Sequence, residues 1–470
     1  MLAAMSAVSG LIRVIGFTFA GASALLVGTT AFSGCSSKTA TPSDAGSDAG
    51  FDAGPMLSRP WDWMGVVGTG QSLSVGQMGT PVVTTTQPFQ NMKLSTGALP
   101  WETLMTDPNN AALTMVPLIE PIGRASTGYP SSWPTNIAGE TAHGSMANQV
   151  TTMAMAADGA DYVGVHGEVG ENGMGIVFLK KGATQSGVNG RAYVATQIET
   201  QAITRLATAM GKTYGVAAII VTHGEADTGN PTYESDLFQL LNDYQTDLSA
   251  ITGQTQKIQM IVSQQNSITD RAASTIAEWR IGVDHPDVVV CSGPKYQYPY
   301  YAGDHVHLVT EGYRQLGEKY GQIYFERVVL GHNWGPLAPT TVERADARTI
   351  KVHYHVPVPP LTWESSFQPP HQMIPEWSAG NGFELRAGAT RLAIASVDIA
   401  DDAVVITTAA DIPASGVTVG YALTGEANAM ATPFVGTFRW GLLRDSDPFV
   451  GAYTQAAQPN YGVAFELPVP

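Results

Sequence analysis

Cysteine and positive charge are both scarce in this chain of 470 residues. Its two cysteines, Cys35 and Cys291, are too few to build a disulfide framework. Lysine and arginine number 24 against 40 aspartates and glutamates, which gives a formal net charge of −16. Proteins bind nucleic acids and anionic membranes through clustered Lys and Arg, so neither is expected as the main partner. An uncharged or cationic polymer fits this charge balance better.

Charged residues of either sign are few, at 14%, whereas apolar residues make up 44% of the chain. That fraction is ample for well-formed hydrophobic cores. Because 470 residues exceed the length of one ordinary domain, we expect two folded units.

The first 34 residues have the composition of an export signal rather than of a folded domain. Arg13 is followed by an apolar run over residues 14–32 and then by small residues up to Cys35, and such a segment is left out of the fold. The FSGC ending resembles a bacterial lipobox, in which the cysteine is lipidated and becomes the new N-terminus, although its phenylalanine departs from the usual Leu or Val. An uncleaved membrane anchor or an ordinary secretory signal are the alternatives, with Cys35 then incidental.

Residues 35–59 repeat Asp-Ala-Gly and show no apolar periodicity, which predicts a flexible linker. We therefore expect an exported protein, held by a lipid on Cys35 at the cell envelope, either at the outer membrane or at the cell surface. Without lipidation the protein would be periplasmic or secreted.

Residues 60–330 predict strands and helices in alternation. Short apolar runs that suit strands buried on both faces occur at residues 64–67, 162–165, 216–222, 258–262 and 288–291. Amphipathic stretches of helical length occur at residues 191–210, 233–251 and 310–328. This alternation predicts an α/β domain with a parallel sheet covered by helices on both faces, in which sites form at the carboxyl ends of strands.

Residues 331–470 have a different character. Prolines interrupt the chain, and no pattern of helical length stands out. Short strands with alternating apolar residues are expected at residues 349–356, 392–399, 403–407 and 417–422. We expect a separate, sandwich-like all-β accessory domain here, which packs on the first domain or touches a polymer.

Three polar clusters follow predicted strands of the parallel sheet. They are Gly68–Ser72, Thr222–Asp227 and, just before a helix, Gly303–Leu308. Since the carboxyl ends of parallel strands meet at one edge of the sheet, these clusters should lie together.

The residue types in these clusters suit nucleophilic catalysis. A serine hydroxyl such as that of Ser72 needs a neighbouring base, usually a histidine that a carboxylate orients. Asp304 and His307 are three residues apart, so one turn can hold both side chains. The alternative that His305 and His307 bind a metal is disfavoured, because no further ligands with suitable spacing are nearby. We expect no metal and no cofactor.

At this point the sequence resembles the SGNH (GDSL-like) hydrolases, in the branch of acetylxylan esterases and sialate O-acetylesterase-like proteins. The likeness consists of three ordered blocks over residues 62–330: Gly-Gln-Ser ending at Ser72, HGEAD at 223–227, and DHVHLVTEGYRQLGEKYG at 304–321. The resemblance implies a flavodoxin-like fold. It implies Ser72 as the nucleophile, His307 as the general base and Asp304 as its orienting carboxylate.

The residues that would hold the oxyanion are less well marked. The resemblance implies the N–H of Ser72, with Gln71 beside it, and a glycine after the next strand, for which we select Gly170. Many family members add an Asn side chain, but Ala226 stands at that position. We expect His223 to make a polar contact in the site and Glu225 to be structural.

The resemblance implies a serine esterase that removes O-acetyl groups from a polysaccharide or glycan. Two alternatives stay open: a lipase- or thioesterase-like hydrolase of the same fold that acts on another acyl ester, and a non-catalytic glycan-binding protein at the cell surface.

Overall fold

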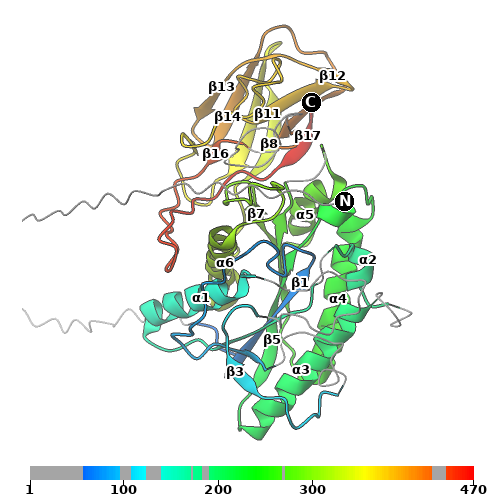
Figure 1. The fold of residues 1–470 in the computed structure, drawn as a ribbon. Coiled ribbons are helices and arrows are strands. Elements are labelled where there is room, and N and C mark those ends of the chain that lie inside the picture. Colours follow the sequence, from blue (N-terminus) through cyan, green and yellow to red (C-terminus); the bar gives the residue numbers. More distant parts are fainter. Residues whose placement is uncertain are drawn as a thin grey trace, which may run out of the picture. The chain divides into compact units, whose positions relative to one another are not determined.

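In a computed structural model of the chain (Figure 1), the residues that the structure describes are 57–95, 107–122, 139–170, 173–182, 190–266, 270–425 and 441–470. The expected signal peptide, Cys35 and nearly all of the expected linker lie outside these residues. None of the helices that these residues form has the length and hydrophobicity that a membrane span requires.

A seven-stranded sheet forms the centre of the first half, in the order β3-β2-β4-β1-β5-β6-β7. Five of its strands run parallel to one another: β1 (Trp63–Gly70), β4 (Gly164–Glu168), β5 (Tyr214–Thr222), β6 (Gln259–Gln264) and β7 (Val289–Pro294). Numbered among themselves, they have the 2-1-3-4-5 order of flavodoxin-like sheets, as predicted. At the edge, β2 (Met92–Leu94) joins β4 in parallel and pairs antiparallel with β3 (Met115–Pro117).

Helices cover both faces of this sheet (Figure 1). On β5, Ile219 and Val221 belong to one hydrophobic core, whereas Ala218 and Ile220 belong to the other. The first core includes residues of α3 (Arg191–Ala209), α4 (Tyr233–Thr252) and α5 (Ala273–Asp284), and the second includes residues of α1 (His143–Asp158) and α6 (Thr310–Tyr324). Short helical segments complete this half: α2 (Ile176–Leu179), η1 (Glu225–Asp227) and η2 (Phe325–Val329).

The second half contains only antiparallel sheets among its described residues, which confirms its all-β character. One sheet has the order β13 (Ile394–Ala400), β14 (Ala403–Thr408), β9 (Thr349–His355) and β8 (Ala338–Arg344). Another has the order β12 (Thr390–Arg391), β11 (Phe383–Ala387), β15 (Val417–Tyr421) and β17 (Phe465–Val469). The remaining pair is β10 (Thr362–Trp363) with β16 (Leu443–Arg444).

The β-rich half packs closely on the α/β half. The side-chain amide of Gln264, at the end of β6, exchanges two 2.8 Å hydrogen bonds with the backbone of Ala464. On α6, the carboxylate of Glu318 accepts hydrogen bonds from the backbone N–H groups of Tyr453 and Thr454. All the described residues fall within one compact unit, and the domain boundary at residue 330 stays a prediction.

Candidate active site

Ser72 lies in the turn that follows β1. Gly70, the last residue of that strand, has a φ of +151°, which favours glycine, and a Cβ there would overlap the carbonyl oxygen of Thr222 on β5. The turn is closed by Ser74, whose N–H and Oγ donate to the carbonyl oxygen of Gln71 at 2.9 and 2.8 Å. The strand therefore ends in a close-packed turn that fixes the direction of Ser72.

Asp304 and His307 lie in the loop between β7 and α6. The backbone N–H groups of Val306 and His307 donate to Asp304 Oδ1 at 2.9 and 3.0 Å. The ring Nδ1 of His307 lies 2.7 Å from Asp304 Oδ2. Burial alone would raise the pKa of Asp304, but the hydrogen bonds from His307 and Val306 hold it below its usual value.

The structure brings Ser72 to this pair across 235 residues of sequence. The Nε2 atom of His307 is 2.8 Å from Ser72 Oγ. Because Nδ1–H donates to Asp304, the neutral ring offers Nε2 as an acceptor for the serine proton. We call Ser72, His307 and Asp304 the serine site. His307 and Asp304 remain partly open to solvent, with 17% and 31% of their side chains exposed.

Gln71 joins the serine turn to the second polar cluster. Its side chain is buried, and its Oε1 accepts a 3.0 Å hydrogen bond from the N–H of Ala226 in η1. The amide of Gln71 is therefore held beside the serine turn by the segment after β5. Among the residues that the structure describes, the neighbouring N–H of Ser72 donates to no acceptor, so it can meet a negative charge that forms near Oγ.

His223 does not occupy the position expected of a polar contact in the site. It is fully buried, its Nδ1 lies 2.7 Å from Tyr233 Oη, and its Nε2 lies 2.7 Å from the carbonyl oxygen of Met174. Both ring nitrogens are thus used inside the protein. His223 stabilises the packing of the loop after β5 instead of facing the serine.

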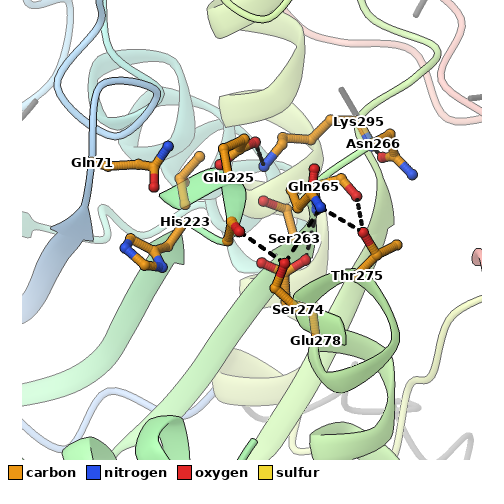
Figure 2. Close-up of polar contacts among 12 residues, drawn as sticks. Gln71, His223, Glu225, Ser263, Gln265, Asn266, Ser274, Thr275, Glu278 and Lys295 are labelled. Carbon is orange, nitrogen blue, oxygen red and sulfur yellow. Dashed lines mark hydrogen bonds and ion pairs between the residues drawn. The ribbon is translucent and has the colours of Figure 1, made fainter. Parts of the chain in front are cut away.

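Glu225 belongs to what we call the buried ion-pair cluster, made of Glu225, Glu278 and Lys295 (Figure 2). The Nζ of Lys295 is 3.0 Å from Glu225 Oε1, and 0% and 3% of the two side chains are exposed. Glu278 accepts a 2.7 Å hydrogen bond from the N–H of Gln265. Burial raises the pKa of Glu278 well above its usual value; the charge of Lys295 opposes this shift, and the charge of Glu225 adds to it.

Gly170 lies against the serine turn, but its N–H already donates a hydrogen bond within the protein. It donates to Glu168 Oε1 at 2.6 Å, and a Cβ on Gly170 would overlap Ser74 Oγ and the backbone nitrogen of Gly70. The structure therefore gives Gly170 a close-packing role and directs its N–H to Glu168 rather than to an oxyanion.

Glu168 belongs to a second buried group of titratable residues. Its Oε2 is 3.2 Å from His143 Nε2, and His143 Nδ1 is 3.1 Å from His166 Nδ1. Burial lowers the pKa of His166 well below its usual value, and nearby His143 adds to this. Burial also raises the pKa of Glu199 to about 8, with a contribution from the charge of Glu168.

Sequence reasoning missed Lys295 and Glu278. Lys295 directly follows β7, the same type of position that Ser72 and Glu225 occupy after β1 and β5. This position at the end of a strand is the feature of the sequence that could have identified Lys295. Glu278 lies in α5, a helix that the sequence pattern did not predict. Within the part of the chain that the structure describes, no group of three or more His, Cys, Asp or Glu side chains could hold a metal ion.

Residues 168–326 match the model of a protein family described as carbohydrate esterase, sialic acid-specific acetylesterase. The matched segment contains His223, Glu225, Lys295, Asp304 and His307. Ser72 precedes it. No curated protein is similar enough in sequence to be matched with the chain.

Comparison with solved structures gives matches at low sequence identity. A carbohydrate acetylesterase from Xanthomonas citri is 11% identical, with a TM-score of 0.50 over 86% of this chain and 80% of its own. An Arabidopsis thaliana protein is 16% identical over 57% of this chain and all of its own, with a TM-score of 0.40. A carbohydrate acetylesterase from Sinorhizobium meliloti is 12% identical over 55% of this chain and 97% of its own, with a TM-score of 0.29. The similarity to the Xanthomonas structure extends through most of both chains and concerns the fold.

Proposed function

We propose that this chain is a carbohydrate esterase that removes O-acetyl groups from a polysaccharide or glycan through a covalent acyl-enzyme on Ser72. The match of residues 168–326 to a family of carbohydrate esterases of the acetylesterase type supports this proposal. The observation that supports this most directly is the position of His307. Its two ring nitrogens lie 2.8 Å from Ser72 Oγ and 2.7 Å from Asp304 Oδ2. This order of hydroxyl, imidazole and carboxylate activates a serine nucleophile.

In the first half-reaction Ser72 Oγ attacks the acetyl carbonyl carbon while its proton passes to Nε2 of His307. The carbonyl oxygen becomes an oxyanion, which the free N–H of Ser72 stabilises. The imidazolium is stabilised by Asp304, whose lowered pKa keeps it ionised. When the tetrahedral intermediate collapses, the C–O bond to the sugar breaks, and His307 Nε2–H protonates the departing sugar oxygen.

In the second half-reaction water replaces the sugar. His307 takes one proton from the water as its oxygen attacks the acetyl-Ser72 carbonyl. Collapse breaks the bond to Ser72 Oγ, which takes the proton back from His307 and leaves as the free hydroxyl. Acetate is released, and no cofactor enters either step.

A Ser72→Ala variant tests the nucleophile. The full chain and this variant are assayed for acetate release from 4-nitrophenyl acetate and from acetylated xylan, with a chelator present. We expect kcat to fall by at least about 10³-fold, because the attacking oxygen is lost. The turn that contains Ser72 is held by backbone contacts rather than by the serine hydroxyl, so circular dichroism should show an unchanged fold. Turnover by the variant at the wild-type rate would exclude Ser72 as the nucleophile.

A panel of 4-nitrophenyl esters of increasing chain length tests the acyl group. An acetylesterase should lose kcat/KM as the chain lengthens. A preference for long chains would instead favour a lipase- or thioesterase-like activity of the same site.

A further inference from the structure

A polar cavity of about 620 Å³ lies where the two halves of the chain meet. The α/β half contributes residues of the segment after β7 and of α6, and the β-rich half contributes residues around β10, β16 and the stretch before β17. The lining residues that bear on its chemistry are Gln297, Gln315, Glu364, Phe367, Arg444 and Tyr461. The cavity does not include any residue of the serine site.

Aromatic rings form one part of its wall. Phe367 and Tyr461 stack with ring centroids 5.6 Å apart and an interplanar angle of 15°. The hydroxyl of Tyr461 donates to Glu364 Oε2 at 2.9 Å, which fixes the orientation of the ring. Phe367 is only partly buried. Apolar ring surface beside a few well-placed polar groups is the usual construction of a pocket for a small or extended ligand.

An ion pair forms the polar part of the wall next to these rings. Arg444 Nε lies 3.2 Å from Glu364 Oε2, and the two side chains are 28% and 13% exposed. Glu364 Oε1 also accepts a 2.7 Å hydrogen bond from the N–H of Ser366. A sugar hydroxyl both donates and accepts hydrogen bonds, so it can interact with the guanidinium and with the carboxylate of one such pair.

The formal charges around the cavity cancel. Its lining contains two cationic residues, Arg444 and Lys319, and two carboxylates, Glu364 and Asp447. Lys319 is buried and uses its Nζ internally, donating to Gln322 Oε1, the carbonyl oxygen of Gln458 and Asn460 Oδ1. No excess positive charge is left for a carboxylated sugar, and the whole chain carries a formal charge of −16. These charges favour a neutral ligand.

The cavity and the serine site share two elements. Gln297 precedes Asp304 in the loop after β7, where Tyr300 and Leu308 form an antiparallel bridge. Gln315 lies on α6, which begins at Thr310. At a rise of about 1.5 Å per residue, Gln315 is about 8 Å along the helix from that residue. The segment from the end of β7 into α6 therefore carries two residues of the serine site, Asp304 and His307, and two residues of the cavity wall, Gln297 and Gln315.

We propose that this cavity binds a segment of a neutral polysaccharide beside the acetylated unit that the serine site holds. The inference rests on the proposed esterase function and narrows its substrate from any acetylated carbohydrate to an extended, uncharged one. It also gives the β-rich half a direct part in substrate binding.

Two variants test the cavity, with a matched control. Ser366→Trp fills it from an exposed lining position, and Phe367→Ala removes an aromatic face. Ser415→Trp places the same large ring on an exposed bend outside the lining. The readout is the ratio of kcat/KM on acetylated xylan to kcat/KM on 4-nitrophenyl acetate, which cancels a general loss of folded enzyme. We expect this ratio to fall at least about fivefold in both cavity variants and to be unchanged in Ser415→Trp. An equal ratio in all four proteins would overturn the proposal.

Direct binding separates failure of the cavity from failure of the esterase proposal. Full-length Ser72→Ala, with and without Ser366→Trp, is titrated by calorimetry with unacetylated xylohexaose, mannohexaose and cellohexaose, and with oligosialic acid. Binding of a neutral hexasaccharide that Ser366→Trp abolishes supports the cavity, even if the wild type released no acetate. Binding of none of the three neutral sugars, or loss of only the oligosialic acid binding in Ser366→Trp, would overturn the neutral-saccharide proposal, even if the wild type is an active esterase.

Discussion

The serine site and the buried ion-pair cluster are built from similar groups at the same edge of one sheet, yet solvent reaches only one of them. Each pairs a carboxylate with a basic nitrogen, at 2.7 Å between Asp304 and His307 and at 3.0 Å between Glu225 and Lys295. The His307 side chain is 17% exposed, whereas that of Lys295 is 0% exposed. A base that is open to solvent can exchange protons with a substrate. An ion pair that is enclosed in the protein cannot reach a substrate and can only stabilise the structure around it.

Position relative to Ser72 strengthens this difference. His307 contacts Ser72 Oγ directly. The buried ion-pair cluster is connected to the serine turn only indirectly. Glu225 directly precedes Ala226, whose N–H donates a hydrogen bond to the side chain of Gln71. We therefore expect substitutions in the serine site to lower kcat, and substitutions in the buried ion-pair cluster to lower the free energy of unfolding.

The largest effect should come from replacing the base. His307→Ala removes the acceptor of the serine proton, so kcat should fall by at least about 10³-fold. His305→Ala is the control two positions away. His305 is buried with a φ of +53°, and its replacement should lower kcat less than about tenfold. Kinetics on 4-nitrophenyl acetate measure both, and a reversed order would mean that His305 is the base.

Lys295→Met should break the buried ion-pair cluster without touching the serine site. It leaves the carboxylate of Glu225 buried opposite an apolar side chain, and losing one partner of a buried pair lowers the free energy of unfolding by about 3–5 kcal/mol. Urea unfolding followed by fluorescence measures the loss.

The double variant Lys295→Met/Glu225→Gln is the control for that experiment, because it removes both charges and should recover much of the stability. A loss of kcat in Lys295→Met with unchanged stability would contradict the separation of the two regions.

A smaller, pH-dependent effect is expected at Glu199, in the buried group beside Glu168. Its pKa is raised to about 8 in the folded protein, whereas in the unfolded chain it is close to the ordinary value of about 4.3. Between these values the folded state holds more protons than the unfolded state, so the stability contributed by this group falls as pH rises.

Glu199→Gln removes that titration. Thermal unfolding should show nearly equal melting temperatures for variant and wild type near pH 4.5, and a variant more stable by a few °C at pH 8 and above. A stability difference that is the same at both pH values would contradict an ionisable, buried Glu199.

Much of the α/β half could be predicted from local pattern. The apolar runs at 216–222 and 258–262 correspond to β5 and β6, and the helix expected at 233–251 corresponds to α4 at Tyr233–Thr252. The helices α1 and α5 were missed, because their small and polar residues, as in HGSMANQV, hide a buried face behind weak amphipathicity. The short edge strands β2 and β3 depend on partners far away in sequence and have little local signal of their own.

Sequence by itself determined the residue types at the strand ends and their order along the chain. Ser72, Asp304 and His307 could be selected because a serine needs a base and an orienting carboxylate, and because parallel strands end at one edge of a sheet. Only the tertiary structure decided how far each polar group is from solvent. Burial depends on every neighbour in space, so only the folded chain shows that His307 is partly open, that Lys295 is enclosed and that His223 lies inside the protein. The packing of the two halves likewise brings residues of both around one cavity.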